Sequence, residues 1–532
     1  MKILVCDPIS PKGIALLQQR AELKVEVLPK RLSEAELLPL VADVTAMVVR
    51  SETKVTRKVI EAAPKLRVVG RAGVGVDNVD VEAATQRGVV VMNTPGGNTT
   101  STAELSFAMI LALARKVPQA QASMAQGKWD RKQFQGVELA DKTLGVLGMG
   151  RIGSEVARRA LAFGMKVKGY DPFLTEERAR SLGIEMAADL DDLYHDADFI
   201  TVHMPVTELT RGMLNAIAFS KMKPGVRIVN CARGEILVEQ DLLAALDAGK
   251  VAAAALDVFS VEPLPADHPF RKHPGITLTP HLGASTAEAQ EKCGIEVAEV
   301  ITSYLLTGEV RNAVNLPFLD AKTYEQIKPY MTLGEKLGRL LAQLAPPQVD
   351  RLHITYGGKA QDLPNIDPVS RAILLGFLSR AAVKDLNNIN VRSIASTLGL
   401  TVEEKRSNEP VTFNEWLHVQ AFNGSKKVIS AGGTFFGSPN NPRIVRLFST
   451  PVEIPISGTI LLLTNKDRPG IVGYLGTLLS RHNVNIANMS LHRDVVGGHA
   501  LTVLSLDSEP PTGVLDELQK DPDISNVKVV RL

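Results

Sequence analysis

The sequence predicts an α/β protein with two parallel sheets in its N-terminal part and two smaller α+β units after them. Three observations support this fold class. Short apolar runs alternate with amphipathic stretches in residues 1–97 and again from 143 to 281, at the spacing of strand–helix crossover units. The chain has 532 residues, more than one hydrophobic core usually organises. Residues 456–532 are predicted as strand, helix, strand, strand, helix and strand.

The first sheet is predicted from the runs KILVCD, AMVVR, LRVVG and GVVVMN, with amphipathic segments between them. A single long helix is expected over residues 99–127. Its apolar residues lie on too many sides for a surface helix, so we expect it to be buried between domains or between copies of the chain. The sequence therefore predicts at least a dimer.

The second sheet is predicted from six runs, TLGVLG, KVKGYD, DFITVH, VRIVNC, AAALDVF and ITLTPH. A second long apolar helix follows His281. The simplest arrangement is discontinuous, with a doubly wound domain at 99–282 inserted in a flavodoxin-like domain made of 1–98 and 283–315.

The remaining residues predict two further domains. Residues 316–455 carry strand candidates such as LHITY and RIVRLF, and a linker is expected around Ile454–Ser457. Residues 456–532 have the order of a split, ferredoxin-like β-α-β-β-α-β unit. The basic residues of the middle domain admit two interpretations, an anion site or a solvated basic face, and the second is favoured; they are Lys426, Lys427, Arg443 and Arg446.

Composition excludes several functional classes. Lys and Arg total 60 and Asp and Glu total 58, so the net charge gives no reason to expect nucleic acid or an anionic membrane as a partner. No apolar run approaches a membrane span, and the first run ends at Asp7 and Pro8, as a strand rather than a signal peptide would. Three widely spaced cysteines show no metal-ligand pattern, so we expect no metal, free thiols and a cytoplasmic protein.

A glycine-rich loop predicts the cofactor. Gly148, Gly150 and Gly153 follow the run TLGVL directly and open a predicted helix, where glycines allow a tight turn and amide groups face a pyrophosphate. Asp171 ends the next strand, at the position of an acid that binds the ribose 2′-hydroxyl and repels a 2′-phosphate. The sequence therefore predicts NAD rather than NADP.

Three residues after successive strands form the predicted catalytic group. Arg233, Glu262 and His281 follow the last three strand candidates, and the carboxyl ends of parallel strands share one edge of a sheet. Histidine titrates near neutral pH and suits a general base, a carboxylate orients its ring, and the guanidinium fork of arginine holds a carboxylate. This group fits the oxidation of a small 2-hydroxy acid.

Five motifs carry a resemblance to a known family: GRAGVGVDNVD, VLGMGRIG, VNCARGEIL, ALDVFSVEPLP and TPHLGAST. On these motifs the chain resembles the D-isomer-specific 2-hydroxyacid dehydrogenases. The resemblance implies that Arg233 binds substrate, that His281 is the acid/base and that Glu262 is its partner. It also implies further cofactor contacts, from Arg151, Ile152, Cys231, Ala232, Asp257, Gly283 and Ala284.

The resemblance extends past residue 315. Residues 316–455 resemble the intervening, allosteric substrate-binding-like domain of the long family members, and 456–532 resemble an ACT regulatory domain. This arrangement implies oxidation of 3-phosphoglycerate to 3-phosphohydroxypyruvate, the entry to serine biosynthesis, by a homo-oligomer, either a dimer or a tetramer. Substrate contacts are expected from Arg50, Arg71, Asn98 and, from a neighbouring copy, Arg131.

Related ACT domains bind serine, which implies a regulatory site at Asn465, Asp467 and Asn485. Feedback-inhibited relatives carry Asn where Asp467 stands, so either serine inhibition or a purely oligomerising ACT domain remains open. Three alternatives to the main function also remain: another D-2-hydroxy acid, reduction of 2-oxoglutarate as a second activity, and a non-catalytic NAD-sensing scaffold.

Overall fold

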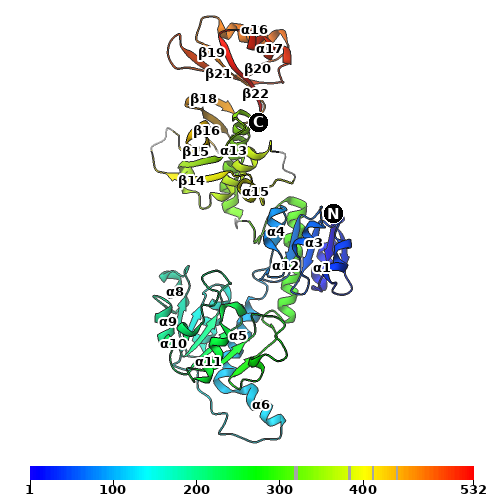
Figure 1. Cartoon of the computed structure of the whole chain (residues 1–532), viewed down its shortest axis with the longest axis vertical. Helices are drawn as coiled ribbons and strands as arrows, with labels where there is room; N and C mark the ends of the chain where they lie inside the picture. Colours follow the sequence, from blue (N-terminus) through cyan, green and yellow to red (C-terminus); the bar gives the residue numbers. More distant parts are fainter. Residues whose placement is uncertain (317–320, 382–384, 410–412, 439–440) are drawn as a thin grey trace.

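The computed structural model describes residues 1–316, 321–381, 385–409, 413–438 and 441–532. Four sheets follow one another along an elongated molecule, with the N-terminal sheet in its middle and the C-terminal sheet at one end (Figure 1). Within these residues no helix has both the length and the hydrophobicity that a membrane crossing requires.

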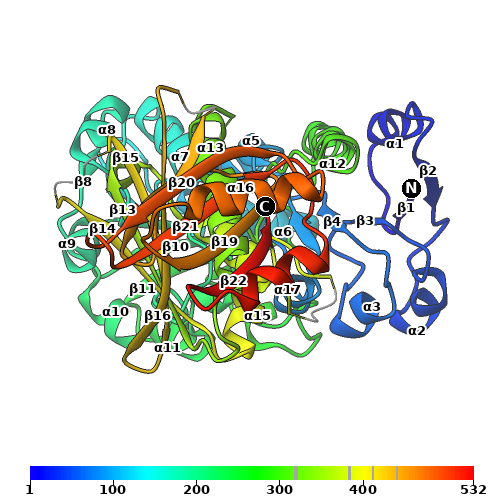
Figure 2. The same cartoon turned by 90° about the horizontal axis from the view of Figure 1, so that it is seen from above.

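The first sheet is parallel, with five strands in the order β2-β1-β3-β4-β5. Apolar residues fill both of its faces and form two separate clusters. Seen from above, this N-terminal region lies to one side of the molecule, and α12 is seen end-on beside it (Figure 2). Its elements are β1 (Lys2–Val5), α1 (Pro11–Gln18), β2 (Lys24–Val27), α2 (Glu34–Leu37), a 3₁₀ turn (Leu38–Leu40), β3 (Ala46–Val49), α3 (Arg57–Glu61), β4 (Val68–Arg71), α4 (Val81–Gln86), β5 (Val90–Met92) and α12 (Ala287–Thr307).

The return of α12 to the first sheet depends on small residues. A Cβ atom on Gly13 of α1 would lie 2.2 Å from the carbonyl oxygen of Gly294 in α12, so only glycine permits this approach. Helix α12 thus packs against the first sheet, although all the elements of the second sheet lie between β5 and α12 in the chain.

The second sheet is parallel and doubly wound, in the order β12-β11-β10-β9-β6-β7-β8. All six predicted strands are present, and a two-residue edge strand, β8, adds a seventh that the sequence analysis did not identify. Its elements are α5 (Thr99–Arg115), α6 (Val117–Ala125), β6 (Thr143–Leu147), α7 (Arg151–Ala162), β7 (Lys166–Tyr170), α8 (Glu176–Leu182), β8 (Glu185–Met186), α9 (Leu190–Asp196), β9 (Phe199–Val202), α10 (Ala216–Lys221), β10 (Val226–Asn230), a 3₁₀ turn (Gly234–Ile236), α11 (Glu239–Asp247), β11 (Val251–Leu256), a 3₁₀ turn (Pro269–Arg271) and β12 (Ile276–Leu278).

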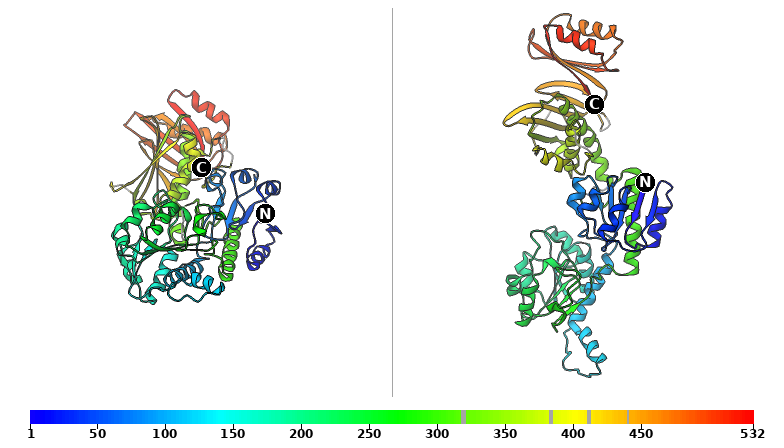
Figure 3. Two further views of the ribbon diagram at one scale, coloured as in Figure 1. Left: turned by 60° about the horizontal axis from the view of Figure 1, so that its bottom comes forward. Right: turned by 45° about the vertical axis from the view of Figure 1, so that its right-hand side comes forward.

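The prediction of one helix over 99–127 is wrong. Lys116 has a left-handed backbone, φ 51°, and ends α5, while Pro118 stands in the first turn of α6, where its missing amide is tolerated. Helix α5 is largely buried, as expected, but no residue of α6 is buried. Helix α6 and the loop after it extend away from the body of the molecule (Figure 3).

The third and fourth sheets form the C-terminal half. The third is mixed, in the order β14-β13-β15-β16-β17-β18, and the fourth is antiparallel, in the order β20-β21-β19-β22. The fourth has the predicted β-α-β-β-α-β order. The elements are α13 (Ala321–Leu344), β13 (Arg351–Gly358), a 3₁₀ turn (Lys359–Asp362), α14 (Asp367–Leu378), α15 (Val391–Thr397), β14 (Thr401–Ser407), β15 (Glu415–Asn423), β16 (Lys426–Phe435), β17 (Pro442–Leu447), β18 (Thr450–Pro455), β19 (Thr459–Lys466), α16 (Ile471–Arg481), β20 (Ile486–Arg493), β21 (His499–Leu506), α17 (Thr512–Lys520) and β22 (Ile524–Arg531).

These two sheets share one hydrophobic core, and the segment predicted as a linker around Ile454–Ser457 is a short connection between strands that pack together. Ile454 is buried in β18, and β19 begins only a few residues later. Apolar residues of β19 and β22, including Ile460 and Val530, belong to the same cluster as the apolar face of α13.

The unit of the third sheet also contacts the unit of the first sheet, because the Asn387 side chain donates a hydrogen bond to the carbonyl of Gly88.

Candidate active site

Glu262 and His281 meet at the carboxyl edge of the second sheet. Nδ1 of His281, after β12, lies 2.7 Å from Oε2 of Glu262, which follows β11. The other carboxylate oxygen of Glu262 accepts a hydrogen bond from the amide of Phe259. Burial raises the pKa of Glu262, but the hydrogen bond and charge of His281, with smaller contributions from Phe259 and Arg233, more than offset it, so the net pKa is lowered. Glu262 is therefore a carboxylate at neutral pH.

Asp257 holds the backbone that presents His281. This buried carboxylate accepts hydrogen bonds from the Thr279 hydroxyl and from the amides of Leu282 and Gly283. His281 has φ 54°, a left-handed conformation that side-chain-bearing residues rarely adopt. The bonds to Asp257 on both sides of His281 stabilise this conformation, which turns the imidazole toward Glu262.

Arg233, the third predicted catalytic residue, connects the two parallel sheets. It follows β10, and its guanidinium pairs at 3.0 Å with the carboxylate of Asp77, in the loop after β4 of the first sheet. A Cβ atom on Gly75 of that loop would lie 1.8 Å from Nη2 of Arg233. A side chain at position 75 would therefore displace the guanidinium from this place.

Arg71 lies beside Arg233 at the end of β4. Burial, and next the positive charge of Arg233, lower the pKa of the Arg71 guanidinium to about 10. Its Nε is buried and has no hydrogen-bond partner among the residues that the structure describes. Arg50, at the end of β3, adds its charge to the same region and donates to the carbonyl of Pro8. Carboxylates neutralise only part of the positive charge of these arginines. This edge of the sheet is therefore suited to a substrate with two anionic groups.

Two other predicted substrate residues lie differently. Asn98 caps the N-terminus of α5, at the junction of the two parallel sheets, and its Oδ1 is buried without a partner in the described part of the chain. Arg131 is exposed in the loop after α6, which lies far from β4 in both views (Figures 1 and 3). Within one copy of the chain the structure does not bring Arg131 to the other arginines.

The glycine-rich loop fits a dinucleotide. Gly148 has φ 95°, and a Cβ on Gly153 would lie 1.9 Å from the carbonyl oxygen of Gly148, so both positions need glycine. A Cβ on Gly150, in contrast, would meet nothing within 4 Å, which leaves room for a phosphate over the N-terminus of α7. Asp171 ends β7, where its carboxylate accepts from the amides of Met149 and Phe173 and stands beside this loop.

The other predicted cofactor residues surround the same edge, except for one side chain. The Gly283 carbonyl accepts hydrogen bonds from Ser101 and Thr102, which ties α5 to the segment that holds His281. The thiol of Cys231 is buried against Met109, so this side chain is not presented to a cofactor. The remaining members are Arg151 and Ile152 in the first turn of α7, Ala232 after β10 and Ala284 after β12.

Sequence reasoning missed the loop 72–78 as part of the site. Asp77 and Gly75 contact Arg233 directly, although more than 150 residues separate them in the chain. The available signal was the pattern GVGVD immediately after a strand, which predicts a turn with close backbone approaches.

The predicted regulatory residues are divided between two ends of the fourth sheet. Asp467 accepts from the guanidinium of Arg493 and from the amide of Gly497, at the end where β19 meets the start of β21. Asn465 is buried beside it and accepts from Thr502. Asn485 precedes β20 at the opposite end, where β20 pairs with the end of β21. One copy of the chain does not bring the three residues together.

Three family models match the chain: the NAD binding domain of D-isomer specific 2-hydroxyacid dehydrogenases over residues 107–283, the D-3-phosphoglycerate dehydrogenase intervening domain over 326–448 and the ACT domain over 459–523. A D-3-phosphoglycerate dehydrogenase of Synechocystis is 43% identical over 531 residues, covering 100% of this chain and 95% of that protein. One of Archaeoglobus fulgidus is 42% identical and covers 100% of both chains. A solved structure of a cofactor (NAD+) bound 3-phosphoglycerate dehydrogenase of Entamoeba histolytica is 30% identical, with a TM-score of 0.51, and covers 60% of this chain and 99% of that one.

Proposed function

This chain belongs to the D-3-phosphoglycerate dehydrogenase family and is an NAD-dependent oxidoreductase; on that premise we propose that Arg233, Glu262 and His281 catalyse the oxidation of 3-phosphoglycerate at C2 by NAD. The product is 3-phosphohydroxypyruvate, which enters serine biosynthesis. The observation that carries the proposal is the 2.7 Å contact between His281 and Glu262, at the same sheet edge as the glycine-rich loop.

The protonation states follow from the geometry. Because an ionised carboxylate only accepts hydrogen bonds, Nδ1 of His281 carries the proton that faces Glu262, and Nε2 becomes the acceptor for the C2 hydroxyl proton. Glu262 stabilises the imidazolium that forms. Bound NAD supplies the acceptor for the hydride that leaves C2. Arg233 holds the substrate carboxylate, and Arg71 and Arg50 bind the phosphate.

The test is NADH formation at alkaline pH with 3-phosphoglycerate, D-glycerate, D-lactate and D-2-hydroxyglutarate. We expect turnover with 3-phosphoglycerate to exceed that with D-glycerate by about 10²-fold or more, the loss expected when charge-assisted hydrogen bonds to the phosphate are removed. Equal turnover with D-glycerate would remove Arg50 and Arg71 from the phosphate site. The assay with D-2-hydroxyglutarate measures the alternative activity, because its oxidation is the reverse of 2-oxoglutarate reduction. Turnover of any of the four substrates would exclude the function of a non-catalytic NAD-sensing scaffold.

His281→Ala tests the assigned base separately from the cofactor. We expect the rate to fall by at least 10²-fold while the NADH dissociation constant, measured by fluorescence, stays within a factor of about three. An equal loss of cofactor affinity would contradict the role given to His281.

We propose further that the chain acts as a homo-oligomer. Helix α6 and the loop after it expose Val117 (57%), Met124 (51%) and Trp129 (79%), an apolar group that a second copy would cover. The same contact would carry Arg131 toward the active site of the second copy. Light scattering of the purified chain tests this, and a monomer at micromolar concentration would overturn it.

We propose also that L-serine binds between the ACT domains of two copies. Because Asn485 lies at the opposite end of the sheet from Asn465 and Asp467, antiparallel pairing of two sheets would bring the residues of both ends together. The carboxylate of Asp467 would meet the serine amine. A serine titration that leaves the rate unchanged would reduce this domain to an oligomerising role.

We propose the domain division 1–98 with 283–315, 99–282, 316–455 and 456–532. The single break of the sheet order after β5 and the return of α12 support the first two. Limited proteolysis tests the division, since the shared core of the last two domains predicts that cleavage near residue 316 precedes cleavage near 456.

We propose the cytoplasm as the location because all three cysteines are free and buried, and cell fractionation tests it.

A further inference from the structure

A carboxylate of the first domain and a guanidinium of the second meet at the hinge, the segment 93–98 that joins β5 to α5. A Cβ atom on Gly96 would lie 3.7 Å from Nη1 of Arg151 and 4.0 Å from Oε2 of Glu296. Arg151 is the first residue of α7, which packs on the second sheet, and Glu296 belongs to α12, which packs on the first. Both charged groups therefore reach the same point of the hinge from different domains.

Glu296 is half-buried and keeps one oxygen on the side of the hinge. Its Oε1 accepts a hydrogen bond of 2.8 Å from the side chain of Asn312, and Oε2 is the atom near Gly96. Burial raises the pKa of Glu296, and the bond from Asn312 and the charge of Arg151 offset only part of that shift. Arg151 is exposed and forms no ion pair among the residues that the structure describes. Each of the two groups is therefore stabilised if the other comes closer.

A chain of hydrogen bonds connects Glu296 to the loop 72–78 at the active site. Asn312, which bonds to Glu296, has a left-handed backbone with φ 55°, and its carbonyl accepts from the amide of Asn93. The side chain of Asn93 donates in turn to the carbonyl of Val74 at 2.6 Å. This is the loop whose glycine and aspartate contact the catalytic arginine. A shift of α12 is therefore transmitted to the place where the substrate carboxylate is expected.

We propose that Glu296 is a positioning residue that couples the binding of NAD to the binding of the substrate. Arg151 opens α7, where the cofactor pyrophosphate is expected, and Glu296 faces the same guanidinium from α12. A guanidinium shared by two anions favours the arrangement in which both are close, so Glu296 holds α12 and the first sheet toward α7 most firmly when NAD is bound. The loop 72–78 then stays against Arg233. The inference rests on the proposed binding of 3-phosphoglycerate beside Arg233.

The coupling is measured as a ratio of two dissociation constants of the full-length chain. NADH and 3-phosphoglycerate are both reduced, so they form a ternary complex that does not react. The emission of NADH gives its dissociation constant without and with saturating 3-phosphoglycerate. We expect the parent to bind NADH about fivefold or more tightly when 3-phosphoglycerate is present, the lower end of common coupling between sites.

Glu296→Gln should lower this ratio to about two or less, with the NADH dissociation constant in the absence of 3-phosphoglycerate changed by less than about threefold. Glutamine keeps an acceptor for Asn312 and removes only the charge. Arg151→Gln should lower the ratio to the same level, and the double variant should lower it no further, because the two residues act as a unit. The matched control is Glu299→Gln, which removes the same charge from an exposed position of the same helix and should keep the parent ratio.

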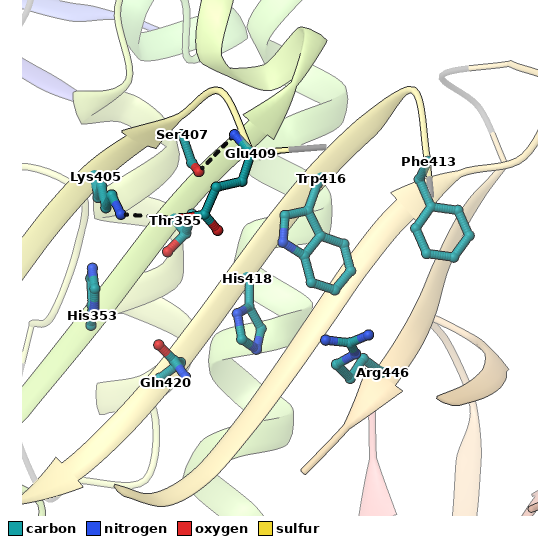
Figure 4. A pocket seen from close by; sticks show the side chains of 10 residues that line it. All are labelled: His353, Thr355, Lys405, Ser407, Glu409, Phe413, Trp416, His418, Gln420 and Arg446. Atoms are coloured by element: carbon teal, nitrogen blue, oxygen red, sulfur yellow. Dashed lines mark hydrogen bonds and ion pairs between the residues drawn. The ribbon is translucent and has the colours of Figure 1, made fainter. Parts of the chain in front are cut away.

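Two measurements check that each variant keeps its fold. Trp416 is only 8% exposed and packs with Phe413 and His418 in a cavity of the third sheet (Figure 4), so unfolding of the C-terminal half would shift its emission. Thermal melting followed by circular dichroism covers the two parallel sheets.

The inference is overturned if Glu296→Gln keeps the parent ratio, or if Glu299→Gln loses it equally. A parent ratio of about one also overturns it. If the parent still turns over 3-phosphoglycerate in that case, the proposed function stands and only the coupling by Glu296 is lost. Absence of both the coupling and the turnover overturns the inference together with the proposed function.

Discussion

Gly75→Ala separates the positioning of Arg233 from the stability of the fold. The added Cβ would lie 1.8 Å from Nη2 of Arg233 and 2.7 Å from a carboxylate oxygen of Asp77. An ordinary contact is about 3.4 Å or more, so the guanidinium must retreat by roughly 1.6 Å. The atom that must move is the end of a flexible side chain, and the backbone at Gly75 does not have a positive φ. We therefore expect the variant to fold.

The displacement should act on catalysis. A misplacement of about 1 Å in a positioning group lowers rates by about 10²-fold, and one lost charge-assisted hydrogen bond corresponds to roughly 1.5–3 kcal/mol. We expect kcat/KM for 3-phosphoglycerate to fall by about 10²-fold, with the NADH dissociation constant unchanged and Tm within about 2 °C of the parent. Steady-state kinetics, fluorescence titration and thermal melting measure the three quantities.

Gly476→Ala is the matched control, because a Cβ there would meet nothing within 4 Å in α16. It should leave kcat/KM unchanged. Wild-type kcat/KM in Gly75→Ala would refute the assignment of Arg233 as the group that holds the substrate. A large fall in Tm would instead show that the loop tolerates no side chain, and would refute the argument from flexible contact.

Gly150→Ala should raise the NADH dissociation constant at least tenfold without changing Tm, because its Cβ has space in the protein but occupies the expected pyrophosphate position; unchanged affinity would contradict the loop's role. Asp171→Ala should weaken NAD binding and relax discrimination against NADP, measured as the ratio of kcat/KM values, whereas an unchanged ratio would remove Asp171 from the ribose site. Lys168→Met should lower Tm most at pH 7. The Lys168 ammonium lowers the pKa of Asp192 and Asp196, so their stabilisation is present above their ordinary pKa of about 4 and is lost as the pH falls through the folded values. The Tm difference between parent and variant should therefore shrink below pH 4, and a constant difference would exclude this mechanism.

Local sequence pattern predicts much of this fold because strand runs and crossover spacing are local properties. Each predicted strand of the second sheet is present, and the rule that parallel strands end at one edge predicts that Glu262 and His281 lie close together. The glycine-rich loop is predictable for the same reason, since its turn, strand and helix are adjacent in the chain.

The errors come from features that periodicity does not encode. Apolar periodicity continues through Lys116, so the break between α5 and α6, caused by a left-handed residue two positions before a proline, was missed. The contact of Asp77 with Arg233 joins two domains and depends on their relative placement. Likewise, the local pattern around Ser457 does not reveal that the strands on either side enter one core.

The shared core of the third and fourth sheets has a consequence for biosynthesis. The last turn of α13 packs beside β22, where Lys528 donates to the carbonyl of Leu344. During synthesis on the ribosome, the apolar face of α13 emerges long before β19 and β22 that complete its cover. The last turn of α13 therefore stays without its β22 cover until the final strand is made, and during this interval a chaperone or an aggregating neighbour has access to it.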